Sequence, residues 1–158
     1  MDTDRIYLPN SRECFVCGED NHAGLKARFY VEENLVKMPL SPQGHHCGYH
    51  NTVHGGVIAA ALDECMGWAV ARKMKRLCVT GELTVRYLKR VPADINLIVH
   101  AEVLKTHRLM ATAKAELVDG EGTVYARSEA RFLPLSEAET RQVDAYLQYD
   151  ENTERLFE

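Results

Sequence analysis

The sequence contains no uninterrupted apolar run that approaches the roughly 20 residues a membrane-spanning helix needs. It also has no excess of basic residues, because its 23 Asp and Glu residues outnumber its 19 Lys and Arg residues and give a net charge of −4. Such a balance argues against a nucleic-acid-binding protein, whose contact surface is basic. The opening residues, MDTDRIYLPN, are too acidic and polar for a secretory signal. We therefore expect a cytoplasmic protein with neither a membrane segment nor a nucleic-acid partner.

Internal repeats and low-complexity segments are also missing, so the chain is expected to form one ordinary globular domain. Its 158 residues fit a single domain, and 46% hydrophobic with 27% charged residues is a typical globular composition. The five cysteines are an odd number in a chain without an export signal, which predicts free thiols in a reducing compartment.

The longest run of apolar and small residues is HGGVIAAALDECMGWAV, at residues 54–70. Its alanines, leucine and methionine predict a helix, and its apolar residues are spread so widely that little of the helix is left to face water. Two adjacent acids, Asp63 and Glu64, lie in the middle of this run. On a buried helix a carboxylate must be paired, neutralised or used in function. The alternative is that one of the two acids lies on a thin exposed stripe.

Strand patterns surround this helix. Residues 26–31 and 35–40 read as a β-hairpin, and residues 41–53 read as a loop that leads into the helix. Four further runs, at residues 77–90, 95–106, 109–118 and 123–133, are joined by short turns and must therefore be antiparallel. We predict an α+β fold, with one antiparallel sheet of five or six strands wrapped around one long central helix.

The chain begins and ends outside this core. A Ser-x-x-Glu spacing at Ser136 and Glu139 predicts the start of an amphipathic helix, and residues 151–158 are expected to fray. We divide the sequence into an N-terminal extension (1–13), the sheet-and-helix domain (14–135) and a C-terminal amphipathic helix with its tail (136–158).

Two cysteines, Cys14 and Cys17, stand at the start of the predicted sheet-and-helix domain. A Cys-x-x-Cys pair can hold half of a zinc site, and the chain offers further ligands in His22, His45, His46, Cys47 and His50. Structural zinc sites usually show two regular ligand pairs, whereas these histidines are irregularly spaced. We expect a Gly-rich turn with two buried thiols and no metal, and we keep a zinc-binding interaction module as an alternative.

Three motifs together carry a family resemblance. His54-Gly55-Gly56, an acid nine residues after the His, and a Thr80-x-x-Leu-x-Val-x-Tyr87 strand resemble the hotdog-fold thioesterase superfamily, and in particular its PaaI-like acyl-CoA thioesterases. The likeness extends from Cys14 to about Leu133. It implies a homodimer or homotetramer with active sites at subunit interfaces, an acyl-CoA substrate and no cofactor. In relatives the Cys14 segment is generally not a metal site.

The resemblance also assigns roles that the chemistry of these residues supports. Gly55 at the helix N-terminus offers a backbone N–H and the positive end of the helix dipole to a thioester carbonyl. The catalytic acid corresponds to Asp63, as nucleophile or as general base. The hydroxyl that orients the water or the acid corresponds to Thr80, with an ordinary strand threonine as the alternative. His54 is expected to shape the turn.

Substrate contacts are predicted around this centre. Relatives often have Asn or Gln six residues before the motif His, where this chain has Gly48, so we expect Asn51, Gln43 or a loop histidine to replace it. Gly56 and Glu64 are further candidates, and Glu64 is the nearest rival of Asp63. Because a net-acidic protein needs a local cationic patch for the phosphates of coenzyme A, we name Arg86, Lys89, Arg90 and Arg108 as candidates. The alternative for each is an ordinary solvated surface residue.

The predicted function is therefore an acyl-CoA thioesterase, a thioester hydrolase that releases the free acid and coenzyme A. A hotdog protein that binds acyl-CoA without cleaving it is the first alternative, because fold alone does not fix function. A hotdog dehydratase is a further one. The sequence leaves open the acyl group and the choice between dimer and tetramer.

Overall fold

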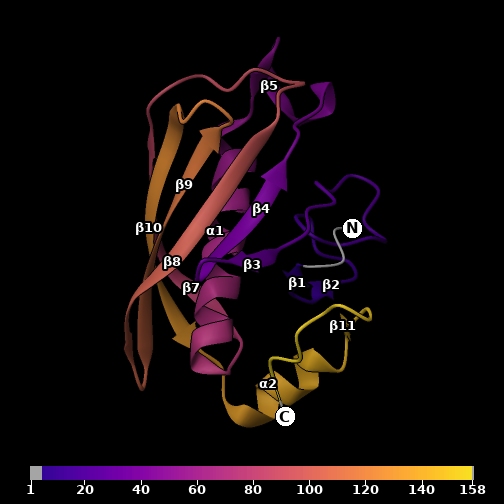
Figure 1. The fold of residues 1–158 in the computed structure, drawn as a ribbon, viewed down its shortest axis with the longest axis vertical. Helices are drawn as coiled ribbons and strands as arrows, with labels where there is room; N and C mark the ends of the chain where they lie inside the picture. The colour runs from indigo at the N-terminus through magenta and orange to yellow at the C-terminus, as the bar shows by residue number, and fades with distance from the viewer. Residues whose placement is uncertain (1–4, 158) are drawn as a thin grey trace.

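The computed structural model describes residues 5–157. One long helix, α1 (Gly55–Met74), lies against the inner face of a seven-stranded sheet (Figure 1). All neighbouring strands pair antiparallel, in the order β1-β3-β4-β8-β9-β10-β7. This confirms the predicted α+β hotdog architecture. The strands are β1 (Ile6–Tyr7), β3 (Tyr30–Glu32), β4 (Leu35–Leu40), β7 (Cys78–Tyr87), β8 (Leu97–His107), β9 (Met110–Asp119) and β10 (Val124–Pro134).

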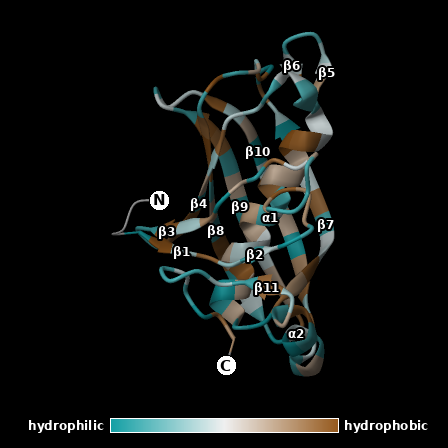
Figure 2. Ribbon diagram, turned by 90° about the vertical axis from the view of Figure 1, so that its right-hand side faces the viewer, coloured by the Kyte–Doolittle hydropathy of each residue, from teal (hydrophilic) through white to brown (hydrophobic). Residues whose placement is uncertain are grey.

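The inner face of the sheet is built largely from alanine, which leaves room for the helix. Buried alanines recur on β8, β9 and β10, and the large apolar side chains of α1 pack against them. Along these strands hydrophobic and hydrophilic residues alternate (Figure 2), because successive side chains point to opposite faces. The alanines in question are Ala101, Ala111, Ala113, Ala115, Ala126 and Ala130.

The structure contains more strands than the five or six that we predicted from the sequence. Two additional two-stranded pairs are present, β5 (Cys47–Tyr49) with β6 (Thr52–Val53), and β2 (Asn10–Ser11) with β11 (Leu147–Gln148). The predicted strand at residues 26–31 begins only at Tyr30. Strands of two or three residues are too short to show a period-2 pattern, so they could not be recognised from the sequence.

The C-terminal segment packs onto the N-terminal one. Helix α2 (Glu137–Asp144) begins with the predicted cap, in which Ser136 Oγ accepts from the Glu139 N–H. The expectation that the tail frays is wrong for residues 151–157, because Leu156 and Phe157 are only 2% and 8% exposed, and Glu158 lies outside the described residues. Arg72 of α1 also forms an ion pair with Glu154 at 2.7 Å. The two end segments therefore lie side by side next to α1 (Figure 1).

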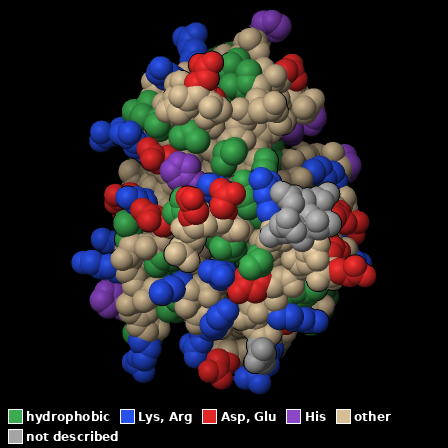
Figure 3. Space-filling view, in the orientation of Figure 1, with side chains coloured by type: hydrophobic (Ala, Val, Ile, Leu, Met, Phe, Trp, Pro, Cys, Tyr) green, Lys and Arg blue, Asp and Glu red, His purple; other side chains and the backbone are tan. Residues whose placement is uncertain are grey.

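Charged side chains of both signs are mixed on the face of the molecule shown in Figure 3. On the face seen in Figure 3, Lys and Arg side chains are interspersed with Asp and Glu side chains and do not gather into one basic area. Within residues 5–157, no helix combines the length and the apolar character needed to cross a membrane.

Candidate active site

The N-terminus of α1 is held by two side chains. His54 precedes the helix as its N-cap, and its Nδ1 accepts a hydrogen bond of 2.8 Å from the Gly56 N–H. Tyr87, at the end of β7, donates from its hydroxyl to the Gly55 carbonyl at 2.7 Å. The Gly56 N–H is thus engaged within the chain, which leaves the Gly55 N–H, at the first helical position, as the donor available to a substrate.

Asp63 lies two turns further along α1 and meets the edge strand β7. Its Oδ1 accepts a hydrogen bond of 2.6 Å from the Thr80 hydroxyl, its one partner among residues 5–157. The side chain is half-buried, and this burial raises its pKa, while the bond from Thr80 lowers it. Because Thr80 occupies one carboxylate oxygen, the other is available to a water molecule or a substrate.

A β-bulge on β7 makes this contact possible. Glu82 pairs with Arg131 and Thr80 pairs with Phe132, so Gly81 is an extra residue in β7. Strict alternation would place Thr80 on the face opposite Leu83 and would point Val79 toward the helix. The bulge instead turns Thr80 toward α1 and leaves Val79 50% exposed.

A cleft of about 290 Å³ opens beside the Asp63–Thr80 pair. Its walls are mostly apolar and come from the N-terminal segment, α1, the start of β7 and the end of β10. Asp63, Glu64 and Thr80 supply its acidic and hydroxyl groups, so it combines apolar walls with a few convergent polar atoms, as small-molecule sites commonly do. Its apolar side chains include Phe15, Val16, Trp68 and Phe132.

Glu64 lines the same cleft but is fully engaged. Trp68 Nε1 donates to its Oε1 at 3.1 Å, and Cys14 Sγ is hydrogen-bonded to its Oε2 at 2.9 Å. Burial and the neighbouring Cys14 raise the pKa of Glu64 to about 8, and a hydrogen bond from Cys17 lowers the pKa of Cys14 to about 5. Of the two adjacent acids, Asp63 is therefore the one with a free oxygen to offer.

The other residues predicted to contact the substrate do not line this cleft in a single chain. Asn51 uses its side chain to accept from the Ala93 N–H at 3.1 Å and lines a separate surface hollow. Arg86 lies in a groove on the outer face of the sheet, Arg90 follows β7, and Arg108 lies in the β8–β9 turn. All three arginines are exposed and remain predicted ligands of the coenzyme A phosphates.

Gly48, which stands where relatives often have Asn or Gln, lies close to the ring of His54. A Cβ at this position would lie 3.3 Å from His54 Cδ2, which is tighter than ordinary contact. Gly48 therefore allows the β5 segment to pack closely on the N-cap histidine. Gln43, another of the predicted replacements, uses its amide to donate to the Ser41 carbonyl at 3.3 Å.

Two functional contacts were missed by reasoning from the sequence. Tyr87 entered only as a marker of strand register, yet it contacts Gly55, 32 residues away. Cys14 was treated as a thiol in a turn, yet it meets Glu64, 50 residues away. Neither contact follows from a local pattern, because it depends on which strand or loop folds next to α1.

The predicted oxyanion donor, Gly55, and the predicted catalytic acid, Asp63, are far apart in one chain. Gly55 and Asp63 are eight residues apart on α1, which at 1.5 Å per residue is about 12 Å along the axis. A thioester carbonyl carbon cannot be within reach of both groups. A single chain therefore holds the two halves of the predicted machinery at separate places.

The chain is similar in sequence to known proteins of the thioesterase superfamily and to an esterase-like protein. Residues 50–126 match the family model described as the thioesterase superfamily. A Pseudomonas aeruginosa protein named "Putative esterase PA0474" is 29% identical over 122 residues, which cover 76% of this chain and 83% of that protein.

Solved structures share the fold. The thioesterase superfamily protein RHA08564 superposes with a TM-score of 0.70 at 21% identity, over 77% of this chain but only 60% of that longer protein. The E. coli PaaI protein, from the phenylacetic acid degradation operon, gives a TM-score of 0.65 at 16% identity and covers 71% of this chain and 81% of PaaI. The resemblance predicted from the sequence is confirmed at the level of fold.

Proposed function

Given that this chain has the hotdog fold of the thioesterase superfamily, similar to that of PaaI, we propose that it hydrolyses an acyl or aryl thioester of coenzyme A. The products are the free acid and the free thiol. One observation carries the proposal: a half-buried carboxylate, Asp63, is aligned by Thr80 at the edge of an apolar cleft.

The proposed chemistry uses Asp63 and Gly55. Asp63 either removes a proton from a water that attacks the thioester carbonyl, or attacks that carbonyl itself. Thr80 donates to Oδ1 and fixes the carboxylate, so that Oδ2 faces the reacting atom. The Gly55 N–H and the helix dipole stabilise the negative charge that develops on the carbonyl oxygen. In the general-base route, the proton taken from water passes to the departing thiolate of coenzyme A. In the nucleophilic route, the thiolate leaves as a mixed anhydride forms on Asp63, and a water then cleaves this anhydride, releases the free acid, regenerates the carboxylate and supplies the proton.

The active enzyme is proposed to be a homodimer or a tetramer of dimers. Within residues 5–157, β7 is the last strand of the sheet and pairs only with β10, so its outer edge is open to another strand. Val79, Tyr87 and Leu88 are exposed along this edge. A second copy placed there would bring its Gly55 N–H toward Asp63 of the first copy and would explain why one chain holds the two groups about 12 Å apart.

Coenzyme A as the carrier is supported by proteins of the same fold. The Streptococcus mutans protein smu.793, with a TM-score of 0.62 and 17% identity, was solved with acetyl CoA bound. A Streptococcus pneumoniae protein of this fold, described as a hypothetical thioesterase, was solved with coenzyme A. The five cysteines of this chain are all free, which suits a cytoplasmic setting.

A panel of acyl-CoA and aryl-CoA thioesters with a thiol-release readout tests this function. We expect release of coenzyme A from at least one chain-length or aromatic class at a rate well above the blank. Binding of these compounds without any thiol release would contradict the proposal and would favour a non-catalytic acyl-CoA-binding protein.

A further inference from the structure

The N-terminal cysteine turn meets the central helix at a cluster with the composition of a metal site. Cys14, Cys17 and Glu64 each offer one ligand atom, and these three atoms lie within 4.8 Å of one another. No other group of three or more His, Cys, Asp or Glu side chains in residues 5–157 is close enough to share an ion. We propose that Cys14, Cys17 and Glu64 bind a zinc ion.

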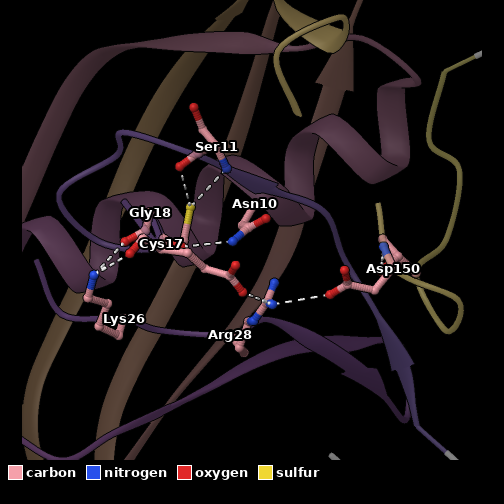
Figure 4. A network of polar contacts seen from close by, with 9 residues as sticks. Asn10, Ser11, Cys17, Gly18, Lys26, Arg28 and Asp150 are labelled. Atoms are coloured by element: carbon pink, nitrogen blue, oxygen red, sulfur yellow. Dashed lines mark hydrogen bonds and ion pairs between the residues drawn. The ribbon is translucent and has the colours of Figure 1, made fainter. Parts of the chain in front are cut away.

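The backbone of the turn is arranged to support two sulfur ligands. The Val16 N–H donates to Cys14 Sγ at 3.3 Å. The Ser11 N–H donates to Cys17 Sγ at 3.4 Å (Figure 4). Backbone N–H groups that point at a sulfur stabilise its thiolate form, which is the form that ligates metals. Each sulfur also donates, Cys14 to Glu64 Oε2 at 2.9 Å and Cys17 to the Ser11 carbonyl at 4.0 Å. Binding of zinc would therefore release the two thiol protons while the backbone N–H contacts stay in place.

The turn is held in place from outside the cluster as well. The Gly18 N–H donates to the Cys14 carbonyl at 2.8 Å, and a Cβ at Gly18 would lie 2.5 Å from that oxygen, so only glycine fits. The Asn10 side chain donates to the Cys17 carbonyl at 3.1 Å, and Lys26 reaches the Gly18 carbonyl at 3.4 Å (Figure 4). The two cysteines thus have little freedom left to lose on binding an ion.

Glu64 completes the set from the other side. Trp68 Nε1 donates to Oε1 at 3.1 Å, which orients the carboxylate and leaves Oε2 directed at Cys14 Sγ. A hydrogen bond of this kind behind the ligand is the usual way in which proteins orient metal-binding side chains. Two thiolates and a carboxylate suit zinc, and three protein ligands leave a fourth position for water next to the half-buried Cys14.

This cluster differs from the zinc site that the sequence analysis weighed. The further ligands predicted from the sequence, the histidines and Cys47, are not part of it. The third ligand is an acid on the central helix. A bound ion would fasten the turn to α1, and Phe15 and Val16, between the two cysteines, form part of the cleft wall beside Asp63. The proposal does not depend on thioester hydrolysis.

Metal content provides the test. The untagged protein, refolded or grown with zinc and then dialysed, is analysed for zinc per chain by elemental analysis. We expect about one zinc in the wild type and in Cys47→Ser, a control thiol outside the cluster, and almost none in Cys14→Ser. Glu64→Gln should weaken zinc binding at least about tenfold in competition with a chromogenic chelator, since even outer-shell partners of a metal contribute that much.

A second readout guards against misfolded variants. Cobalt added in place of zinc should give the sulfur-to-cobalt charge-transfer absorption in the wild type, and this band should fall in Cys14→Ser while far-UV circular dichroism stays unchanged. Wild-type protein that binds no zinc or cobalt would overturn the proposal, whether its two thiols are free or joined in a disulfide. Equal zinc content in wild type, Cys14→Ser and Glu64→Gln would overturn it too, because the ion would then lie elsewhere.

Discussion

At the scale of single residues, the proposed reaction depends on Asp63. Asp63→Asn removes the basic and nucleophilic oxygen but keeps the size of the side chain and a group that accepts from Thr80. We expect kcat to fall by about 10²- to 10⁴-fold, the usual contribution of a general base, with an unchanged fold. Thiol release under saturating substrate measures this loss.

The control for that experiment is a carboxylate on the opposite side of the molecule. Glu102 forms an exposed ion pair with Lys114 on the sheet, so Glu102→Gln makes the same chemical change away from the cleft. It should keep wild-type turnover. An active Asp63→Asn variant would rule out Asp63 as the catalytic acid.

Thr80 is a positioning residue, because it acts through Asp63. Thr80→Val removes the hydroxyl and should lower kcat by about 10- to 100-fold, the value of a hydrogen bond to a charged group, with little change in KM. Thr80→Ser keeps the hydroxyl and should restore most of the rate. Equal losses in both variants would show that the methyl packing of Thr80 matters and its hydroxyl does not.

At the scale of elements, the sequence predicts best those features that are encoded by neighbouring residues. The helix around residues 54–70 was recognised from its helix-forming residues, and the start of α2 was recognised from the Ser136 cap. Both signals are local, because they act within one or two turns. The face of Thr80 could not be derived in the same way, since it depends on an extra residue, Gly81, that is visible only against the partner strand β10. The family resemblance placed Thr80 in the site where strict alternation would have turned it away.

The start of α1 offers a clean test of the oxyanion donor. Gly55 occupies the first helical position, where proline is well tolerated, and His54 before it has φ −59° and ψ 132°, which suits a residue preceding proline. Gly55→Pro therefore removes one N–H with little strain. We expect kcat to fall by about 10²- to 10³-fold, as for other oxyanion donors, while Gly55→Ala, which keeps the N–H, stays active.

Thiol-release kinetics of these two variants measure the effect, and thermal unfolding shows whether each one is folded. A fully active Gly55→Pro variant would remove the Gly55 N–H from the proposed mechanism. Loss of activity in both variants would instead indicate that the added side chain disturbs the nearby Tyr87 ring, 3.4 Å from the new Cβ.

His54 belongs to the same element but has a different role. Its Nδ1 caps the helix at Gly56, so His54→Ala should lower the free energy of unfolding by about 1 kcal/mol. His54→Asn supplies another acceptor and should keep most of that stability. Urea denaturation measures both values, and two variants of equal instability would show that ring packing, including that against Gly48, outweighs the cap.

At the scale of the whole molecule, the two ends of the chain close over one side of α1. The sequence predicted a frayed tail because residues 151–158 are mostly polar, but Leu156 and Phe157 are buried and β11 pairs with β2. These contacts join segments more than a hundred residues apart, which no local pattern can show. They also support the wall that carries Cys14 and lines the cleft.

The central claim is that each active site takes Gly55 from one copy and Asp63 from the other, and mixed dimers test it most directly. Gly55→Pro and Asp63→Asn chains are co-expressed with different affinity tags and purified through both tags, so that every dimer contains one of each. Neither parent should be active alone. If sites are shared, one site of each mixed dimer contains both native groups, and about half of the wild-type turnover per dimer should return. Mixed dimers as inactive as their parents would contradict the claim, because every site would then depend on the two groups of a single chain.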